Sequence, residues 1–242
     1  MNILVMLAGS NEDFLKNGQK YPKLLTEIGG KTMIEIVIEG IRSLIKPENN
    51  IIFILNKNDH DKYYLGDVIK IILPESSVTT IENETAGAAL TSLLAIEYIN
   101  EEDPMVLING DQLLDINEEK VVKSFIRRDS DAGVIVFDSL HPRWSYVKIN
   151  KDGLVLEAAE KKPISNKATA GFYYYKRAAD YIRCAKKMIL KGGGVNGLYY
   201  VCPVFNEMIL EQKKILTHQI DQHEYHSFMS PQKVKEFEQK GL

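Results

Sequence analysis

The first ten residues of this 242-residue chain constrain its fold more than any other segment does. Residues 3–7 form an apolar run of strand length, and the turn Ala8-Gly9-Ser10 follows it directly. A continuous apolar run that ends in a glycine turn is typical of a buried parallel strand. The loop after such a strand can offer backbone N–H groups to phosphate oxygens. The segment therefore predicts either a nucleotide site that includes Leu7, Ala8, Gly9 and Ser10, or one of the many α/β turns that bind nothing.

Strand-like and helix-like patterns alternate along the first half of the chain. Continuous apolar runs predict buried strands at 51–55 and 105–108, and helical spacing of apolar residues predicts helices over 34–45 and 86–99. A further helix is expected over about 117–128 and a strand over 132–137. Such alternation predicts an α/β fold with three αβα layers and a mostly parallel mixed sheet.

The second half of the chain has a different pattern. Alternating residues at 145–149, the turn 150–153 and the run 154–156 predict a β-hairpin. A strand is expected over 170–175 and a helix over 178–190, and Ser230-Pro231 begins a last helix over 232–240. The sequence shows no repeat and no shift in composition. We therefore expect one domain over 1–242, with two halves over about 1–137 and about 138–242.

Composition narrows the classes of partner. The formal net charge of −3 gives no attraction to nucleic acid, and the basic pairs Arg127-Arg128 and Lys186-Lys187 are expected on solvated helix faces. Cys184 and Cys202 are expected to be buried reduced thiols. Met1-Asn2 carries no basic leader region, and no apolar stretch approaches the roughly 20 residues of a membrane helix. We expect a cytoplasmic protein that binds neither nucleic acid nor membrane. The aromatic strand at 172–175 either packs in the core or faces a second subunit of a homo-oligomer.

The segment Asn109-Gly110-Asp111 follows the predicted strand at 105–108. A carboxylate at this position lies at the carboxyl edge of the sheet, where α/β folds gather ligands and where Mg²⁺ finds hard oxygen donors. Asp111 is therefore either a magnesium ligand or a turn residue that caps the next element. Asp115, four positions later, is either a second ligand or a surface residue.

Several of these segments together resemble one family of enzymes. Leu7-Ala8-Gly9, Pro22-Lys23, the run 27–34 and Gly110-Asp111 resemble the sugar-phosphate nucleotidyltransferases, also called NDP-sugar pyrophosphorylases. The resemblance spans nearly the whole chain. It implies that the half over about 1–137 faces a nucleotide and that the half over about 138–242 faces an acceptor. It implies a Rossmann-like, GT-A-type fold and an Mg²⁺-dependent enzyme that joins an NTP to a sugar phosphate or similar small phosphorylated acceptor. It also implies release of pyrophosphate and a role in making nucleotide sugars for surface polysaccharide such as capsule.

The resemblance assigns the nucleotide side residue by residue. Lys23 would neutralise the triphosphate, and Asp111 would hold the metal beside Asn109 and Gly110. Thr85-Ala86-Gly87-Ala88 resembles the small-residue segment that lies against the nucleobase and ribose in the family, so Ala86 and Gly87 are expected to contact the base. Small side chains let a flat ring approach the backbone closely. Without the resemblance, Glu84 or Thr85 would be a plain helix cap.

On the acceptor side, the resemblance implies that Glu160 binds substrate hydroxyls and that Lys161 neutralises the acceptor phosphate. Gly171 leads the following strand, as in the family. The segments 144–146, with Tyr146, and 196–203, with Asn196, are expected to form further walls of the acceptor pocket, although an aromatic ring there could equally belong to the core. Lys162 is an extra residue before Pro163 and leaves open which lysine points inward. Without the resemblance, Glu160-Lys161-Lys162 would be a solvated run of charges.

The chain departs from the family at three places, of which the replacement of a proline by Thr32 is the least important. The family follows Leu-Ala-Gly with a second glycine and an arginine that binds the leaving triphosphate, whereas this chain has Glu12 and Asp13 there. A carboxylate within about 4 Å of a triphosphate would repel it by several kcal/mol in a partly desolvated site. Either this loop folds away or the phosphates bind poorly. Near the C-terminus, where the family often supplies a second metal-binding aspartate, the chain offers Glu224 or His226.

Three hypotheses therefore follow. The first is an active nucleotidyltransferase in which the acceptor phosphate attacks the α-phosphorus of an NTP, with Mg²⁺ on Asp111, Lys23 and Lys161 as the stabilising cations. No general base is needed because the nucleophile is already an anion. The second is a non-catalytic nucleotide-binding or nucleotide-sugar-binding homologue. The third is a GT-A glycosyltransferase, which often carries two aspartates around one residue, whereas 109–111 contains one.

Overall fold

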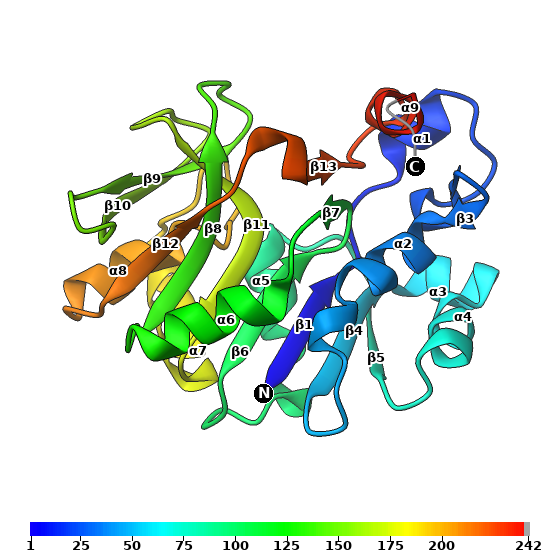
Figure 1. Ribbon diagram of the computed structural model, residues 1–242. Helices are drawn as coiled ribbons and strands as arrows, with labels where there is room; N and C mark the ends of the chain where they lie inside the picture. Colours follow the sequence, from blue (N-terminus) through cyan, green and yellow to red (C-terminus); the bar gives the residue numbers. More distant parts are fainter. Residues whose placement is uncertain (240–242) are drawn as a thin grey trace.

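The structure, a computed structural model, describes residues 1–239 and is built around a mixed nine-stranded sheet. Its strands are β1 (Asn2–Met6), β4 (Asn50–Asn56), β5 (Ser77–Ile81), β6 (Met105–Asn109), β8 (Ala132–Asp138), β9 (Ser145–Ile149), β10 (Val155–Glu160), β11 (Lys167–Tyr175) and β12 (Ile215–Gln219). The order across the sheet is β10-β9-β11-β6-β1-β4-β5, with β8 paired to β11 and β12 paired to β8 (Figure 1). Strands β10 and β11 run antiparallel to the others, so the sheet is mixed and mostly parallel, as expected.

Helices cover both faces of this sheet. They are α1 (Glu12–Lys16), α2 (Met33–Gly40), α3 (Lys57–Tyr63), α4 (Leu65–Ile72), α5 (Ala88–Leu93), α6 (Glu118–Arg127), α7 (Ala178–Leu190), α8 (Val204–Leu210) and α9 (Pro231–Glu238). Side chains alternate across a strand, so β1 contributes to two cores. Ile3 and Val5 share one core with Phe125 of α6. Leu4 shares the other core with Tyr181 of α7. The three-layer prediction is confirmed.

The C-terminal segment returns from β12 to the nucleotide-facing half. Strand β13 (Tyr225–Ser227) pairs antiparallel with β7 (Gln112–Leu114), directly after Asp111. The amide of Phe228 donates to the Asp111 carbonyl oxygen over 2.8 Å. Helix α9 follows and brings Glu238 to the amide of Gly29. The segment 221–239 therefore ties the acceptor-facing half to the loops around Asp111 (Figure 1).

Most predicted elements are present with shifted ends. The helix expected over 86–99 is shorter, because α5 ends at Leu93 and a 3-10 turn, η3 (Ile96–Tyr98), follows it. The helices α1, α3 and α8 and the strand β12 were not predicted. The expected last helix begins after Ser230 as predicted, but Lys240 lies outside the described residues.

Two expectations about side-chain packing are settled by burial. Residues 172–175 of β11 are all at most 4% exposed, so this aromatic strand packs in the core rather than facing a second subunit. Cys184 and Cys202 are both buried free thiols, as expected. Among the described residues, no helix combines the length and the apolar character needed to cross a membrane.

Candidate active site

A cavity of about 510 Å³ opens at the carboxyl ends of β1 and β6. The loop Ala8-Gly9-Ser10 lines it after β1, and Asn109 and Asp111 line it after β6. The two strands pair in parallel register, with Met6 opposite Asn109, so the two loops emerge side by side. Leu7 is 3% exposed and packs in the core instead of lining the cavity. The volume is in the range of a small-molecule site.

Lys23 and Asp111 form the charged centre of the nucleotide side. Lys23 begins the 3-10 turn η1 (Lys23–Leu25), and its Nζ lies 2.9 Å from Asp111 Oδ2. A Cβ atom placed on Gly9 would lie 2.8 Å from the same Nζ. Lys23 is 5% exposed and does not itself line the cavity, whereas Gly9 and Asp111 do. The ammonium is therefore buried directly behind the proposed phosphate loop and is paired with the proposed metal ligand.

Gly110 has a structural role and does not line the cavity. Its amide donates to the Met6 carbonyl oxygen over 3.0 Å, and a Cβ atom there would lie 2.2 Å from Leu7 Cδ2 and 2.6 Å from the Met6 oxygen. The close approach of β1 and the 109–111 turn thus requires glycine. The expectation that Gly110 binds nucleotide is replaced by a packing role that sets the position of Asp111.

The acidic loop folds away from the cavity. Asn11 caps α1, its Oδ1 accepts the Lys23 amide, and the helix turns Glu12 and Asp13 to the surface while Phe14 is buried. Glu12 forms an exposed ion pair with Lys16, which lowers the pKa of the Glu12 carboxyl. Neither acid lines the cavity. Of the two outcomes expected for this departure, the structure shows the one in which the loop folds away from the cavity.

The segment expected at the nucleobase is tied to the C-terminal half. The Tyr199 amide donates to the Ala86 carbonyl oxygen over 2.7 Å, and the Ala89 amide donates to the Tyr199 oxygen over 3.0 Å. Gly87 has φ 108° and a Cβ atom there would lie 2.3 Å from the Tyr199 oxygen, so the crossing of these two backbones requires glycine. Gly87 lines the cavity and Ala86 does not. Thr85 and Thr91 add hydroxyls to the same wall, 2.6 Å apart.

Glu160 and Lys161 lie on the opposite, acceptor-facing wall. Glu160 is 7% exposed and accepts a hydrogen bond from the Ser145 hydroxyl. Burial raises the pKa of the Glu160 carboxyl, and the bond from Ser145 opposes that rise. Lys161 has φ 53°, a strained conformation for a residue with a side chain, and lines the cavity. Lys162 is exposed and does not, so Lys161 is the lysine that points inward.

Tyr200 holds the Lys161 side chain. Lys161 Nζ donates to the Tyr200 hydroxyl over 2.8 Å and lies 5.0 Å from the centre of the Tyr200 ring. The hydrogen bond raises the pKa of Lys161, so the ammonium stays charged at neutral pH. Tyr200 lies within the predicted wall segment 196–203, although the prediction named Asn196 and not Tyr200.

Gly171 lines the cavity between the two sides. It has φ 61°, and a Cβ atom there would lie 2.4 Å from Asn109 Nδ2 and 2.5 Å from Gln112 Oε1. Gln112 Nε2 donates to the Ala170 carbonyl oxygen over 2.7 Å, whereas its Oε1 has no hydrogen-bond partner in the described residues. The register shift of β11 between Thr169 and Tyr173 falls at this glycine. Gly171 therefore makes room for the polar edge that follows β6.

Two predicted acceptor residues lie elsewhere. Tyr146 is fully buried and its hydroxyl donates to the His141 carbonyl oxygen over 2.7 Å, because alternation along β9 turns its ring into the core. Asn196 is exposed in a turn with φ 52° and does not line the cavity. The neighbours that do line it are Arg143, Trp144, Ser145, Leu198, Tyr200 and Val201. Both predictions found the right segment and the wrong side chain.

The donor set around Asp111 fits a magnesium ion that is held mainly by substrate. Glu224 caps the turn η4 (Gln222–Glu224) by accepting the Asp221 amide, and His226 packs on Phe237, and neither lines the cavity with Asp111. Residues 1–239 contain no cluster of three metal-ligating side chains. Mg²⁺ commonly keeps several waters and takes one or two carboxylates together with substrate phosphates, so a single carboxylate at the cavity edge suffices.

A comparison with known proteins identifies the family of this chain. The family model described as nucleotidyl transferase matches residues 17–192. The chain belongs to this family. It is 26% identical over 157 residues to the bifunctional protein GlmU of Thermosipho melanesiensis, a match that covers 64% of this chain and 32% of that protein. The chain therefore spans about a third of that relative's length.

Solved structures share the fold along the whole nucleotidyl transferase chain. The nucleoside-diphosphate-sugar pyrophosphorylase of Vibrio cholerae RC9 superposes with a TM-score of 0.87 at 24% identity, covering 99% of this chain and 100% of that one. The inositol-1-phosphate CTP transferase of T. maritima superposes with a TM-score of 0.73 at 14% identity, covering 100% and 97%. The fold is thus that of nucleotidyltransferases, as the N-terminal motifs predicted.

Proposed function

We propose that this nucleotidyl transferase joins the nucleotidyl group of an NTP to the phosphate of a small phosphorylated acceptor, of the sugar-phosphate class, and releases pyrophosphate. The observation that carries the proposal is one cavity with charged groups on two facing walls. Asp111, backed by Lys23, lies on one wall, and Lys161 lies on the other. The similar proteins named above include a nucleoside-diphosphate-sugar pyrophosphorylase and an inositol-1-phosphate CTP transferase, which supports this class of reaction.

The reaction needs positioning and charge rather than a protein nucleophile. A phosphate oxygen of the acceptor forms a bond to the α-phosphorus of the NTP, the bond from that phosphorus to the bridging oxygen breaks, and pyrophosphate carries the electron pair away. No proton has to move, because the attacking oxygen is already an anion. Negative charge grows on the bridging and leaving oxygens, and fixed cations close to them lower the barrier.

Each wall supplies a distinct part of this chemistry. The backbone of Ala8-Gly9-Ser10 would receive the triphosphate, with the Lys23 ammonium behind Gly9. Lys161 would neutralise the acceptor phosphate, and Glu160 beside it would accept hydrogen bonds from acceptor hydroxyls. Asp111 would hold Mg²⁺, which when bound stabilises charge on phosphoryl oxygens as a Lewis acid.

A nucleotide-binding protein without transferase activity is less well supported than an active transferase. That alternative depended on Glu12 and Asp13 repelling the triphosphate, and both side chains point away from the cavity. The glycosyltransferase alternative gains no second aspartate, since the acidic side chains that line the cavity are Glu84, Asp111 and Glu160. Transfer of the nucleotide is therefore the function that the site supports best.

The experiment is a matrix of the four NTPs, with Mg²⁺, against a panel of sugar and polyol phosphates. Pyrophosphate release is followed for each pair. We expect sustained release for at least one pair and none when the acceptor is omitted. Nucleotide binding by calorimetry without release from any pair would overturn the proposed transfer.

A further inference from the structure

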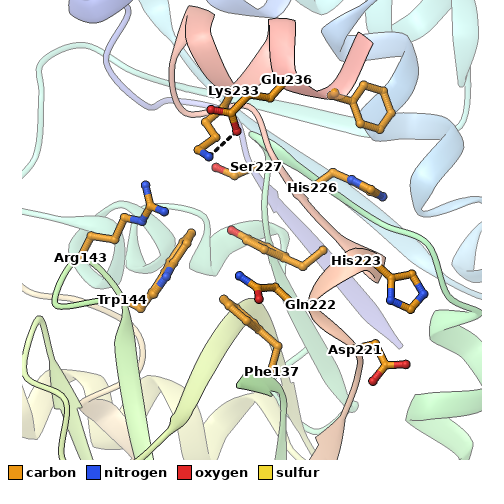
Figure 2. Close-up of a pocket in the computed structure, with 12 residues that line it drawn as sticks. Phe137, Arg143, Trp144, Asp221, Gln222, His223, His226, Ser227, Lys233 and Glu236 are labelled. Carbon is orange, nitrogen blue, oxygen red and sulfur yellow. Dashed lines mark hydrogen bonds and ion pairs between the residues drawn. The ribbon is translucent and has the colours of Figure 1, made fainter. Parts of the chain in front are cut away.

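Arg143, Trp144, Lys233 and Glu236 are among the residues that line a second cavity, of about 670 Å³ (Figure 2). This cavity adjoins the active-site cavity and shares Arg143, Trp144 and Tyr225 with it. The shared wall is aromatic. The Tyr225 ring stacks on Phe137 with centroids 4.8 Å apart, and Trp144 meets both rings edge-on at 5.4 Å. Packed rings of this kind hold one another in fixed orientations. Trp144 and Tyr225, held by these ring contacts, therefore form a rigid wall that the two adjoining cavities share.

Arg143 places a positive charge at this junction. Its guanidinium lies 4.8 Å from the centre of the Trp144 ring. Within residues 1–239, Arg143 takes part in no ion pair, whereas Lys233 across the second cavity is paired with Glu236 (Figure 2). The acid Asp221 in the same cavity caps the turn η4. Arg143 is thus the cation at the junction whose charge is not neutralised by a carboxylate.

The junction lies next to the group that would hold the acceptor phosphate. The Lys161 amide donates to the Trp144 carbonyl oxygen over 3.0 Å, so the strands β9 and β10 bring Lys161 beside the residue that follows Arg143. The triphosphate loop Ala8-Gly9-Ser10 lines the first cavity and not the second. An acceptor that extends from Lys161 toward the second cavity would meet Arg143.

We propose, on the basis of the transferase function above, that the acceptor carries a second anionic group remote from its reacting phosphate, and that Arg143 binds this group at the junction of the two cavities. The acceptor class is then a small phosphorylated molecule with a carboxylate or a second phosphate. A guanidinium is always charged and presents a planar fork of donors that fits either anion. The Trp144 face keeps the fork oriented, which lowers the ordering cost of binding.

The test uses acceptors that differ in one group. Glucose 1-phosphate is compared with glucuronic acid 1-phosphate and with glucose 1,6-bisphosphate, and glycerol 3-phosphate is compared with 3-phosphoglycerate. Affinity is measured by calorimetry in the presence of Mg²⁺ and an α,β-methylene NTP, so that binding is read without turnover. The protein variants are wild type, Arg143→Gln and the control Arg127→Gln, which makes the same change on an exposed face of α6.

We expect wild type and Arg127→Gln to bind the more anionic acceptor of at least one frame about tenfold or more tightly, as a charge-assisted hydrogen bond provides. Arg143→Gln should lose that preference. Comparison of the carboxylate and bisphosphate arms then identifies which anion is bound. Equal affinity in wild type for the less anionic and the more anionic acceptor of every frame, or a preference that survives Arg143→Gln, would overturn the proposal. So would an equal loss of affinity for every acceptor in Arg143→Gln, because the group that all the acceptors share is the reacting phosphate. Because the readout is binding, these results are separate from a failure of pyrophosphate release, which would refute transfer itself.

Discussion

The two walls of the cavity hold their charges in different ways. On the nucleotide side, Lys23 is 5% exposed and paired with Asp111, and glycines at 9 and 110 let backbone and side chains approach closely. On the acceptor side, Lys161 and Arg143 are exposed and lie over aromatic rings. Every NTP presents the same triphosphate, so a preformed buried pair suits it. Acceptors differ in shape. The exposed side chains of Lys161 and Arg143, which lie over aromatic rings, can adopt the conformation that suits the acceptor that binds.

The largest effect is expected at the buried pair. Asp111→Asn should lower turnover at least about a hundredfold, because it removes the carboxylate at the cavity edge and leaves the Lys23 ammonium without its partner. Pyrophosphate release measures the effect, and a thermal melt separates it from unfolding. Asp115→Asn is the matched control, since Asp115 is exposed and does not line the cavity. Equal rates of pyrophosphate release for Asp111→Asn and wild type would show that Asp111 is not part of the active site.

A smaller loss is expected on the acceptor wall. Lys161→Met should lower kcat/KM for the acceptor by about ten- to a hundredfold, because one charge-assisted contact to phosphate is lost, while the KM for the NTP changes less. Lys162→Met should have little effect, since that side chain points away from the cavity. Steady-state kinetics with each substrate varied in turn gives both constants. A larger change in the KM for the NTP would show that the walls are assigned the wrong way round.

The crossing of Gly87 and Tyr199, where the halves meet, is expected to be sensitive to a single methyl group. Gly87→Ala should destabilise the fold by about 1–3 kcal/mol, because the residue has φ 108° and the new Cβ would lie 2.3 Å from the Tyr199 oxygen. Gly18→Ala is the control: Gly18 has φ 85° and open space around it. Chemical denaturation compares the two. Equal losses would mean that backbone strain alone, and not the contact between halves, decides the cost.

A pH effect on stability is expected at Glu118, which does not line the active-site cavity. Glu118 is 3% exposed at the start of α6 and accepts the Ser43 hydroxyl over 2.6 Å, and burial raises the pKa of its carboxyl from 4.5 to about 7. A raised folded-state pKa means that the neutral carboxyl favours the fold, so its contribution is present below pH 4.5 and is lost as pH rises toward 7. Glu118→Gln, which keeps the hydrogen-bond acceptor, should be more stable than wild type at pH 8 and similar at pH 4.5. A melting temperature difference that does not change with pH would contradict this.

The smallest effect is expected at the acidic loop. Asp13→Arg should change the KM for the NTP less than about twofold, because exposed charges outside the cavity are screened by salt over about 8–10 Å. Steady-state kinetics at two salt concentrations checks this result. A marked gain in NTP affinity would show that the loop faces the phosphates after all.

The sequence predicts the nucleotide side better than the acceptor side. Lys23 and Asp111 are 88 residues apart, yet each follows a local pattern, and parallel pairing of β1 with β6 brings their loops together. The helix over 178–190 was predicted with the observed ends, because its apolar spacing is regular. Local pattern was insufficient at Gly87 and Gly110, where glycine is required by a backbone that crosses from a distant segment.

The acceptor wall depends on which way single side chains point. Ser145 begins β9 and lines the cavity, and alternation turns the next side chain, Tyr146, to the opposite face and into the core. The sequence pattern gives this alternation but not which of the two faces is the cavity. Tyr146 was therefore assigned to the cavity although Trp144 and Ser145 line it. Tyr200 depends on a loop that reaches Lys161 across 39 residues, which no local pattern signals. The family and the fold were predictable from the sequence, whereas the side chains that line the proposed acceptor wall were not.

The most direct test is a crystal structure of the protein with Mg²⁺, an α,β-methylene NTP and an acceptor phosphate. We expect the triphosphate on the backbone of Ala8-Gly9-Ser10 beside Asp111, and the acceptor phosphate at Lys161, with its oxygen facing the α-phosphorus. A triphosphate bound away from the Lys23–Asp111 pair, or an acceptor phosphate away from Lys161, would contradict the division of the cavity into a nucleotide wall and an acceptor wall.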